Sequence, residues 1–172
     1  MTPRKRKTSG KSQLLEHGVN TLHALGFQVY DGMPQFRGAR VVPERYVVRN
    51  YPSPTIYGTQ GRKEAFIVAP GPAPEFVSDK DGRVRILVEA KWQEASGSVD
   101  EKMPFVWMSF IESDIRNWIV IMDGAYWRTP RGKRVVDWMQ ARRAHSDRRW
   151  YVVTANQFIH LATKVWGREQ AA

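Results

Sequence analysis

The chain has no cysteine among its 172 residues. This absence excludes disulfide bonds and thiolate metal sites, and it fits a reducing compartment such as the cytoplasm. Long apolar runs are also missing, since none approaches the roughly 18 residues that a membrane-spanning helix needs. The basic opening MTPRKRKTSGK is not followed by an apolar stretch, so we do not expect a signal peptide there.

Acidic residues are scarce relative to basic ones. The chain has 27 Lys and Arg against 17 Asp and Glu, a formal net charge of +10, which favours a polyanionic partner. The basic residues are grouped, in the stretches RKRK (4–7), RTPRGKR (128–134) and RRAHSDRR (142–149). Such groups neutralise phosphates. Within them we expect the following side chains to contact nucleic-acid phosphates: Arg4, Lys5, Arg6, Lys7, Arg128, Arg131, Lys133 and Arg134.

Signatures of two other chemistries are missing. The four histidines are scattered and none belongs to an HExxH pattern, so a zinc site is not expected. No GxxxxGK[ST] sequence occurs, so we expect no nucleotide cofactor.

Apolar periodicity predicts an α/β protein. A first helix is expected at 12–25, with Ser12 as its cap and Gly26 as its stop. Continuous apolar runs predict strands at 64–69, 83–92, 118–124 and 150–155, and helical patterns occur near 99–113, at 133–143 and at 156–166, the last capped by Asn156. This alternation indicates a mixed sheet covered by helices on both faces. We expect a flexible basic arm at 1–10, one domain at 11–168 and a tail at 169–172.

The stretch RILVEAKWQEASGSVDEK places polar residues at the end of an apolar strand. Side chains two positions apart share a face of a strand, so Glu89, Lys91 and Gln93 project together. One interpretation is the solvated end of a strand with an ordinary Glu/Lys pair. The other is a metal-dependent phosphodiesterase site.

These residues resemble the PD-(D/E)xK nuclease superfamily. The likeness consists of a helix that bears Glu16, a strand-borne acid, the Glu-x-Lys of Glu89 and Lys91 with Gln93 two residues on, and the segment SGSVDEK. The resemblance implies a restriction endonuclease-like fold, with a mixed central β-sheet flanked by helices on both faces. It also implies a Mg²⁺-dependent DNA endonuclease, with Mn²⁺ as a substitute ion, acting as a homodimer in a bacterial or phage-infected cytoplasm.

The first acid of the pattern has two candidates, Glu64 and Glu75. If residues 64–69 pair with 84–89 in an antiparallel hairpin, Glu64 lies opposite Glu89. Glu75, in PAPEF, is the more literal echo of the family's Pro-Asp, but a tight hairpin would set it nearer to residues 86 or 87. We therefore expect Glu64, with Glu75 as the alternative.

The resemblance implies hydrolysis of a phosphodiester, and it gives the residues at this strand end the following roles. Glu64 and Glu89, with the Ala90 carbonyl, would hold Mg²⁺, which prefers hard oxygen ligands. Lys91 would orient the attacking water and stabilise developing charge.

Each of five further residues has both a functional and a structural interpretation. Glu16 would hold a water near the metal or be a helix-surface charge, and Gln93 would bind a phosphate oxygen or make a structural strand-end hydrogen bond. Lys102 would reach the DNA backbone or form an exposed pair with Glu101. The aromatic pair Tyr126 and Trp127 would stack on a base or pack in the interior. For the whole chain, the alternative to a nuclease is a non-catalytic nucleic-acid-binding protein on the same fold.

Overall fold

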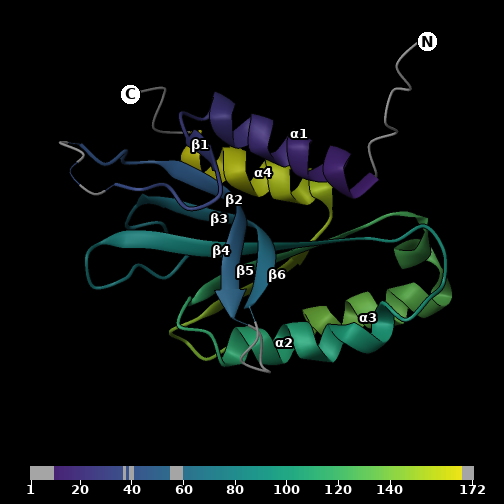
Figure 1. Ribbon diagram of the computed structural model, residues 1–172. Helices are drawn as coiled ribbons and strands as arrows, with labels where there is room; N and C mark the ends of the chain where they lie inside the picture. The colour runs from purple at the N-terminus through teal and green to yellow at the C-terminus, as the bar shows by residue number, and fades with distance from the viewer. Residues whose placement is uncertain (1–9, 37, 39–40, 55–59, 168–172) are drawn as a thin grey trace, which may run out of the picture.

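The computed structural model describes residues 10–36, 38, 41–54 and 60–167, which form one mixed sheet with helices on both faces (Figure 1). The elements, in chain order, are α1 (Gly10–Ala24), β1 (Gln28–Asp31), β2 (Tyr46–Pro54), β3 (Gln60–Pro70), β4 (Arg83–Trp92), the 3₁₀ turn η1 (Asp100–Lys102), α2 (Met103–Ile111), β5 (Asn117–Asp123), the 3₁₀ turn η2 (Ala125–Arg128), α3 (Pro130–Gln140), β6 (Arg149–Val153) and α4 (Ala155–Trp166). The predicted fold class is thereby confirmed.

The six strands lie in the order β1-β2-β3-β4-β5-β6. β2, β3 and β4 form an antiparallel meander, whereas β1 pairs with β2, β5 with β4 and β6 with β5 in parallel. In Figure 1, α1 and α4 cover one face of the sheet, and α2 and α3 cover the other. Parallel strands connected by helices bury both faces, which explains why β4 and β5 read as continuous apolar runs.

Two hydrophobic clusters fill the two sides of the sheet. On the α1 and α4 side, Ile67, Ile86 and Ile119 of the sheet pack with helix residues such as Leu22 and Phe158. On the α2 and α3 side, the sheet contributes Phe66, Leu87 and Trp118, which pack with residues of both helices, among them Met103, Phe110 and Met139. Successive apolar side chains along β3 and β4 therefore alternate between these two clusters.

The predicted hairpin register is confirmed. Ala65 pairs with Val88, Ile67 with Ile86 and Ala69 with Val84, so residues 64–69 run antiparallel to 84–89 as expected. Glu64 directly precedes the first of these pairs, and its side chain reaches β4 at the Ala90 backbone N–H.

Helix starts differ from the sequence prediction at three places. Ser12, the predicted cap of the first helix, lies inside α1, which already includes Gly10. α4 begins at Ala155 rather than Asn156, because Thr154 is the cap: its hydroxyl accepts from the Gln157 backbone N–H, and the Gln157 side chain accepts from the Thr154 N–H. This reciprocal pair is a capping box, and it outcompetes a cap at Asn156. α3 begins three residues before the predicted Lys133, since Thr129 caps it and Pro130 fits its first turn.

Both ends of the chain extend beyond the described part. The basic arm predicted at 1–10 lies outside it, apart from Gly10, the first residue of α1, and so does the tail at 169–172. Within the described residues, no helix is both long and apolar enough to cross a membrane.

A glycine closes the junction between β5 and η2. Gly124 has φ of 113°, and a Cβ atom there would lie 2.3 Å from the carbonyl oxygen of Gln93. The chain folds this closely because the Gln93 N–H donates to the Asp123 carbonyl at 3.0 Å and the Tyr126 N–H donates to the Gln93 carbonyl at 3.1 Å. The end of β4 is thereby held against η2.

We predict that Gly124→Ala destabilises the fold by roughly 3 kcal/mol or more, because backbone conformation and contact with Gln93 both oppose a side chain. Gly82→Ala is the matched control, since Gly82 also has positive φ, 76°, but faces open space. That control should cost only about 1 kcal/mol. Urea denaturation measures both values, and equal losses would contradict a close contact at Gly124.

Candidate active site

A buried carboxylate with two lysine partners lies at the end of β4. Glu89 is 6% exposed, and it follows Leu87 on the face covered by α2 and α3. Its Oε2 accepts from Lys63 Nζ at 2.7 Å, and its Oε1 pairs with Lys91 Nζ. A buried charge needs such partners to be tolerated, so this ion cluster is a defined polar site within an apolar sheet.

Lys63 is a member of this cluster that the sequence analysis missed. Its side chain is only 11% exposed, and its ammonium lies 4.7 Å from the centre of the Trp118 ring. Lys63 and Phe66 thus reach the same side of the sheet although they are three residues apart, which regular alternation forbids. Sequence periodicity alone therefore assigns Lys63 to the wrong face.

This irregularity coincides with a single step of the β2–β3 pairing. Arg49 pairs with Ala65 and Tyr51 with Lys63, and between these pairs lie Asn50 and Glu64. Asn50 has φ of 52°, the left-handed conformation that asparagine tolerates better than most residues. The break in alternation on β3 thus falls beside the left-handed residue of β2, and Lys63, just beyond it, bonds Glu89.

Glu64 contacts β4 through its side chain. Its Oε2 accepts a hydrogen bond from the Ala90 backbone N–H at 2.9 Å. The predicted acids Glu64 and Glu89 therefore both lie next to Ala90, one through a hydrogen bond and the other through the chain. The structure brings these three residues together with Lys91.

The lysines keep Glu89 charged. Burial by itself would raise the pKa of this carboxyl, but the charges of Lys91 and Lys63, together with their hydrogen bonds, outweigh burial and hold the pKa of Glu89 below its ordinary value. An ionised carboxylate at neutral pH is what a cation-binding site needs.

The turn η2 fixes the strand end that carries Lys91. The indole N–H of Trp127 donates to the Lys91 carbonyl at 2.9 Å, and the Tyr126 N–H donates to the Gln93 carbonyl. Both aromatic side chains are buried, so they pack in the interior rather than offer a surface for base stacking. The Gln93 side chain donates to the Ala95 carbonyl at 2.6 Å. This is the kind of strand-end hydrogen bond that the structural interpretation of Gln93 describes.

Asp100, the aspartate of SGSVDEK, belongs to η1 and links the start of α2 to the turn η2. Its Oδ2 accepts from the Tyr126 hydroxyl at 2.9 Å and from Arg131 Nε at 2.9 Å. The bond from Tyr126 and the bond from Arg131 lower the pKa of Asp100. Sequence reasoning missed this residue, although its place between a Gly/Ser turn and a helix start was a usable signal.

The remaining predicted acids lie elsewhere. Glu16 is exposed on α1, which packs against α4 on the face opposite to that of Glu89. Glu75 lies in the loop between β3 and β4, where its Oε1 pairs with Lys164 Nζ of α4 at 3.1 Å. The structure therefore places the alternative first acid at the other end of the hairpin from Glu89.

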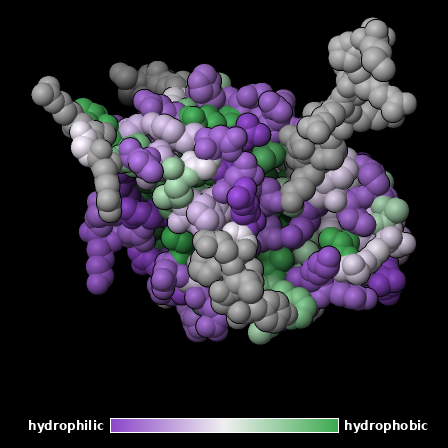
Figure 2. Space-filling model, in the orientation of Figure 1, coloured by the Kyte–Doolittle hydropathy of each residue, from purple (hydrophilic) through white to green (hydrophobic). Residues whose placement is uncertain are grey.

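The basic residues predicted to bind phosphates are exposed where the structure describes them. Arg128 and Arg131 have side chains 78% and 63% exposed, each with an acidic partner, Asp123 and Asp100. Lys102, Lys133 and Arg134 are also exposed. Arg4, Lys5, Arg6 and Lys7 lie outside the described residues. Hydrophilic side chains cover most of the face seen in Figure 2, broken by small hydrophobic areas.

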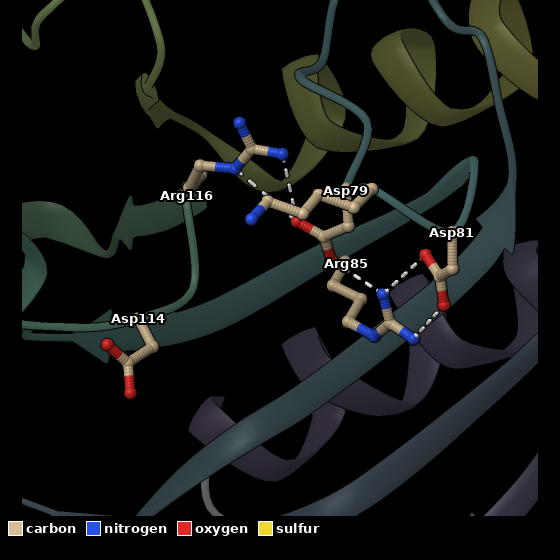
Figure 3. Close-up of a pocket in the computed structure, with 6 residues that line it drawn as sticks. Asp79, Asp81, Arg85, Asp114 and Arg116 are labelled. Atoms are coloured by element: carbon tan, nitrogen blue, oxygen red, sulfur yellow. Dashed lines mark hydrogen bonds and ion pairs between the residues drawn. The ribbon is translucent and has the colours of Figure 1, made fainter.

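A second charged region lies at the opposite end of β4. Arg85 bonds both Asp79 and Asp81, and Arg116 bonds Asp79, as Figure 3 shows for the open pocket that they line. These side chains satisfy one another and hold the hairpin loop against the start of β5. We therefore interpret this pocket as the surface of a structural ion-pair network and not as a reaction site.

The residues around Ala90 fit a hard divalent ion. Within the described residues, no three His, Cys, Asp or Glu side chains gather as a complete metal cage. Mg²⁺ does not need one, because it keeps several waters and commonly takes only one or two carboxylates. Glu64, which accepts from the Ala90 N–H, and the adjacent Glu89 supply carboxylate oxygens of the kind that such an ion takes.

Comparison with known families agrees with this geometry. A family profile described as PD-(D/E)XK nuclease superfamily domain matches residues 7–166. The match spans most of the 172 residues, and the protein therefore belongs to the PD-(D/E)XK nuclease superfamily. No curated protein and no solved structure matches the chain.

The depressed pKa of Glu89 predicts how acid affects stability. A carboxyl whose pKa is lower in the folded state than its ordinary value of 4.5 contributes stability that is present above that value and lost as pH falls through the folded pKa. The stability advantage of the wild type over Glu89→Gln should therefore shrink below pH 4.5. Urea denaturation at several pH values measures it.

Asp81→Asn is the control for this measurement. Its hydrogen bonds with Arg85 lower the pKa of Asp81 from 3.8 to about 2, so any contribution of that carboxylate should be constant above pH 3.8 and should decline only between pH 3.8 and about 2. A wild-type advantage over Glu89→Gln that stays constant down to pH 3 would contradict the arrangement at Glu89.

Proposed function

We propose that the protein is a metal-dependent DNA endonuclease, with Mg²⁺ as the ion and Mn²⁺ as its substitute. The observation that supports this most is the buried, ionised Glu89 at the end of β4, paired with Lys91 and followed by Ala90, whose N–H donates to Glu64 of the neighbouring strand. Core packing gives a carboxylate no reason to be there, since an apolar residue would fill the position without a desolvation cost. Membership of a nuclease superfamily makes phosphodiester hydrolysis the chemistry to test.

In this proposal, Glu64, Glu89 and the Ala90 carbonyl would hold the ion. When bound, Mg²⁺ would stabilise the negative charge that builds on the phosphate. Lys91 is two residues beyond Glu89 on the same face, with a side chain 24% exposed, so its ammonium can reach both the carboxylate and an incoming substrate. Its task is to orient the attacking water and to stabilise developing charge. The roles of Glu16 and Gln93 stay predictions.

The substrate surface in this proposal is the group of exposed basic residues near the start of α3. Lys133 and Arg134 stand on the first turns of that helix, and Arg128 and Arg131 flank them. Phosphate contacts of this kind give affinity without sequence readout. Cutting both strands of a duplex requires two active sites, so a homodimer is the assembly we propose.

One observation favours a second candidate, a nucleic-acid-binding protein without catalysis. Both carboxylate oxygens of Glu89 are bonded to lysines, which leaves neither of them free for an ion in this arrangement. If those ion pairs persist in the presence of metal, the fold would bind DNA but not cut it. Nicking of supercoiled plasmid with Mg²⁺, against EDTA, separates the two functions.

We predict that Glu89→Gln and Lys91→Ala each reduce plasmid nicking by about 10²-fold or more, since each removes charge that acts on the reacting phosphate. Both variants should still bind DNA in Ca²⁺, which gel-shift assays measure. Nicking at the wild-type rate by either variant would show that the proposed site is wrong.

Glu64 and Glu75 provide the matched pair for this experiment. Glu64→Ala should lose Mg²⁺-dependent nicking, whereas Glu75→Ala should cut near the wild-type rate because its carboxylate pairs with Lys164 at the other end of the hairpin. The reverse result would overturn the assignment of the first acid.

A separate prediction concerns affinity. Replacing Lys133 and Arg134 by alanine, or deleting residues 1–7, should weaken DNA binding about equally for all sequences. Each lost phosphate contact should flatten the slope of log affinity against log salt by roughly 0.9 units. Lys80→Ala, an exposed lysine in the hairpin loop at the other end of β4, is the control for net charge. Slopes equal to that of the control would remove these residues from the interface.

A further inference from the structure

Lys63 has a position that the Glu-x-Lys pattern does not explain. Its ammonium bonds Glu89 Oε2 at 2.7 Å, on the opposite carboxylate oxygen from Lys91. The side chain is nearly buried, and the ammonium lies over the ring of Trp118 at 4.7 Å. Glu89 and Trp118 are thus the contacts that orient this buried cation.

Lys63 occupies a carboxylate oxygen that an ion held by Glu89 would need. The other acid, Glu64 of β3, also reaches this part of β4, where it accepts from the Ala90 N–H. Lys63 precedes Glu64 on β3 and bonds Glu89 from that strand. Lys91, in contrast, belongs to β4 itself and bonds the other oxygen.

We propose that Lys63 is a built-in competitor of the metal ion. In the metal-free protein its ammonium neutralises Glu89 Oε2, and metal binding requires this ion pair to break while Lys91 stays in place. The proposal rests on the proposed metal-dependent function, and it assigns Lys63 a role distinct from that of Lys91. Lys63 thereby lowers the affinity of the free protein for metal.

Charge and burial support this choice of lysine. One carboxylate with two ammonium groups already carries excess positive charge, and a divalent ion beside both would add unfavourable repulsion. Lys91 is more exposed than Lys63, so water can take up its charge without displacement from the site. The displaced Lys63 gives up a nearly buried bond, which makes metal binding weaker than the two carboxylates alone would allow.

The wild-type protein supplies a direct readout of the displacement. The Lys63 CH₂ group next to the ammonium lies near the Trp118 ring, so its proton resonances should be shifted upfield from those of exposed lysines. In spectra of protein labelled with ¹³C-lysine, Lys63→Met identifies this signal. Titration with Mg²⁺ should move it towards the position of exposed lysines, in step with metal occupancy.

Affinity gives an independent test. In calorimetry with Mn²⁺, Lys63→Met should bind the ion about tenfold more tightly than wild type, since the competitor is gone while the apolar stem remains. Lys91→Met should change the affinity less, and Lys80→Met, which removes a distant exposed charge, should leave it unchanged. Glu89→Gln should bind Mn²⁺ more weakly than wild type.

The outcomes separate this proposal from the function on which it rests. Glu89-dependent Mn²⁺ binding with a stationary Lys63 signal, or unchanged affinity in Lys63→Met, would overturn the competitor role and leave the nuclease function standing. Absence of both Glu89-dependent metal binding and metal-dependent nicking would overturn the two together. A moving Lys63 signal with tighter binding in Lys63→Met supports both.

Discussion

The antiparallel register of β3 and β4 is the constraint on which the candidate site depends. Ala65 opposite Val88 determines which residues of β3 stand beside the end of β4. A shift of one residue would move every side chain of β3 to the other cluster, so that Ala65 or Ile67 would stand where Phe66 packs, and side-chain volumes would no longer match in either cluster. The hydrophobic core therefore selects the register, and the register brings Lys63 and Glu64 to Glu89.

The same hairpin shows why one member of the site could be predicted and another could not. Glu64 followed from pairing two apolar runs, because residues 64–69 and 84–89 each read as buried strand. Lys63 did not, because the side-chain alternation of β3 breaks between Lys63 and Phe66, beside the left-handed Asn50 of the neighbouring strand. Strand periodicity carries no information about such a step, although asparagine is a residue type that permits it.

Other differences between sequence and structure have equally local causes. Apolar runs located β4 and β5 within one residue, since burial on both faces leaves an unbroken signal. Helix starts were less certain, because Thr154 and Asn156 are both good caps and only the Gln157 side chain decides between them. Contacts between distant segments, such as Asp100 with Tyr126 and Arg131, have no sequence periodicity and required the structure.

The two ends of β4 differ in how the charges of their side chains are balanced. At the loop end, Arg85 and Arg116 are matched by Asp79 and Asp81, so little net field extends into solvent. At the other end, Glu89 has two lysine partners, and the exposed basic residues of α3 stand on the same side of the sheet as its carboxylate. In the function proposed above, a polyanion would be attracted towards the end that holds the buried acid, because unbalanced charge acts at a distance whereas a satisfied ion network does not.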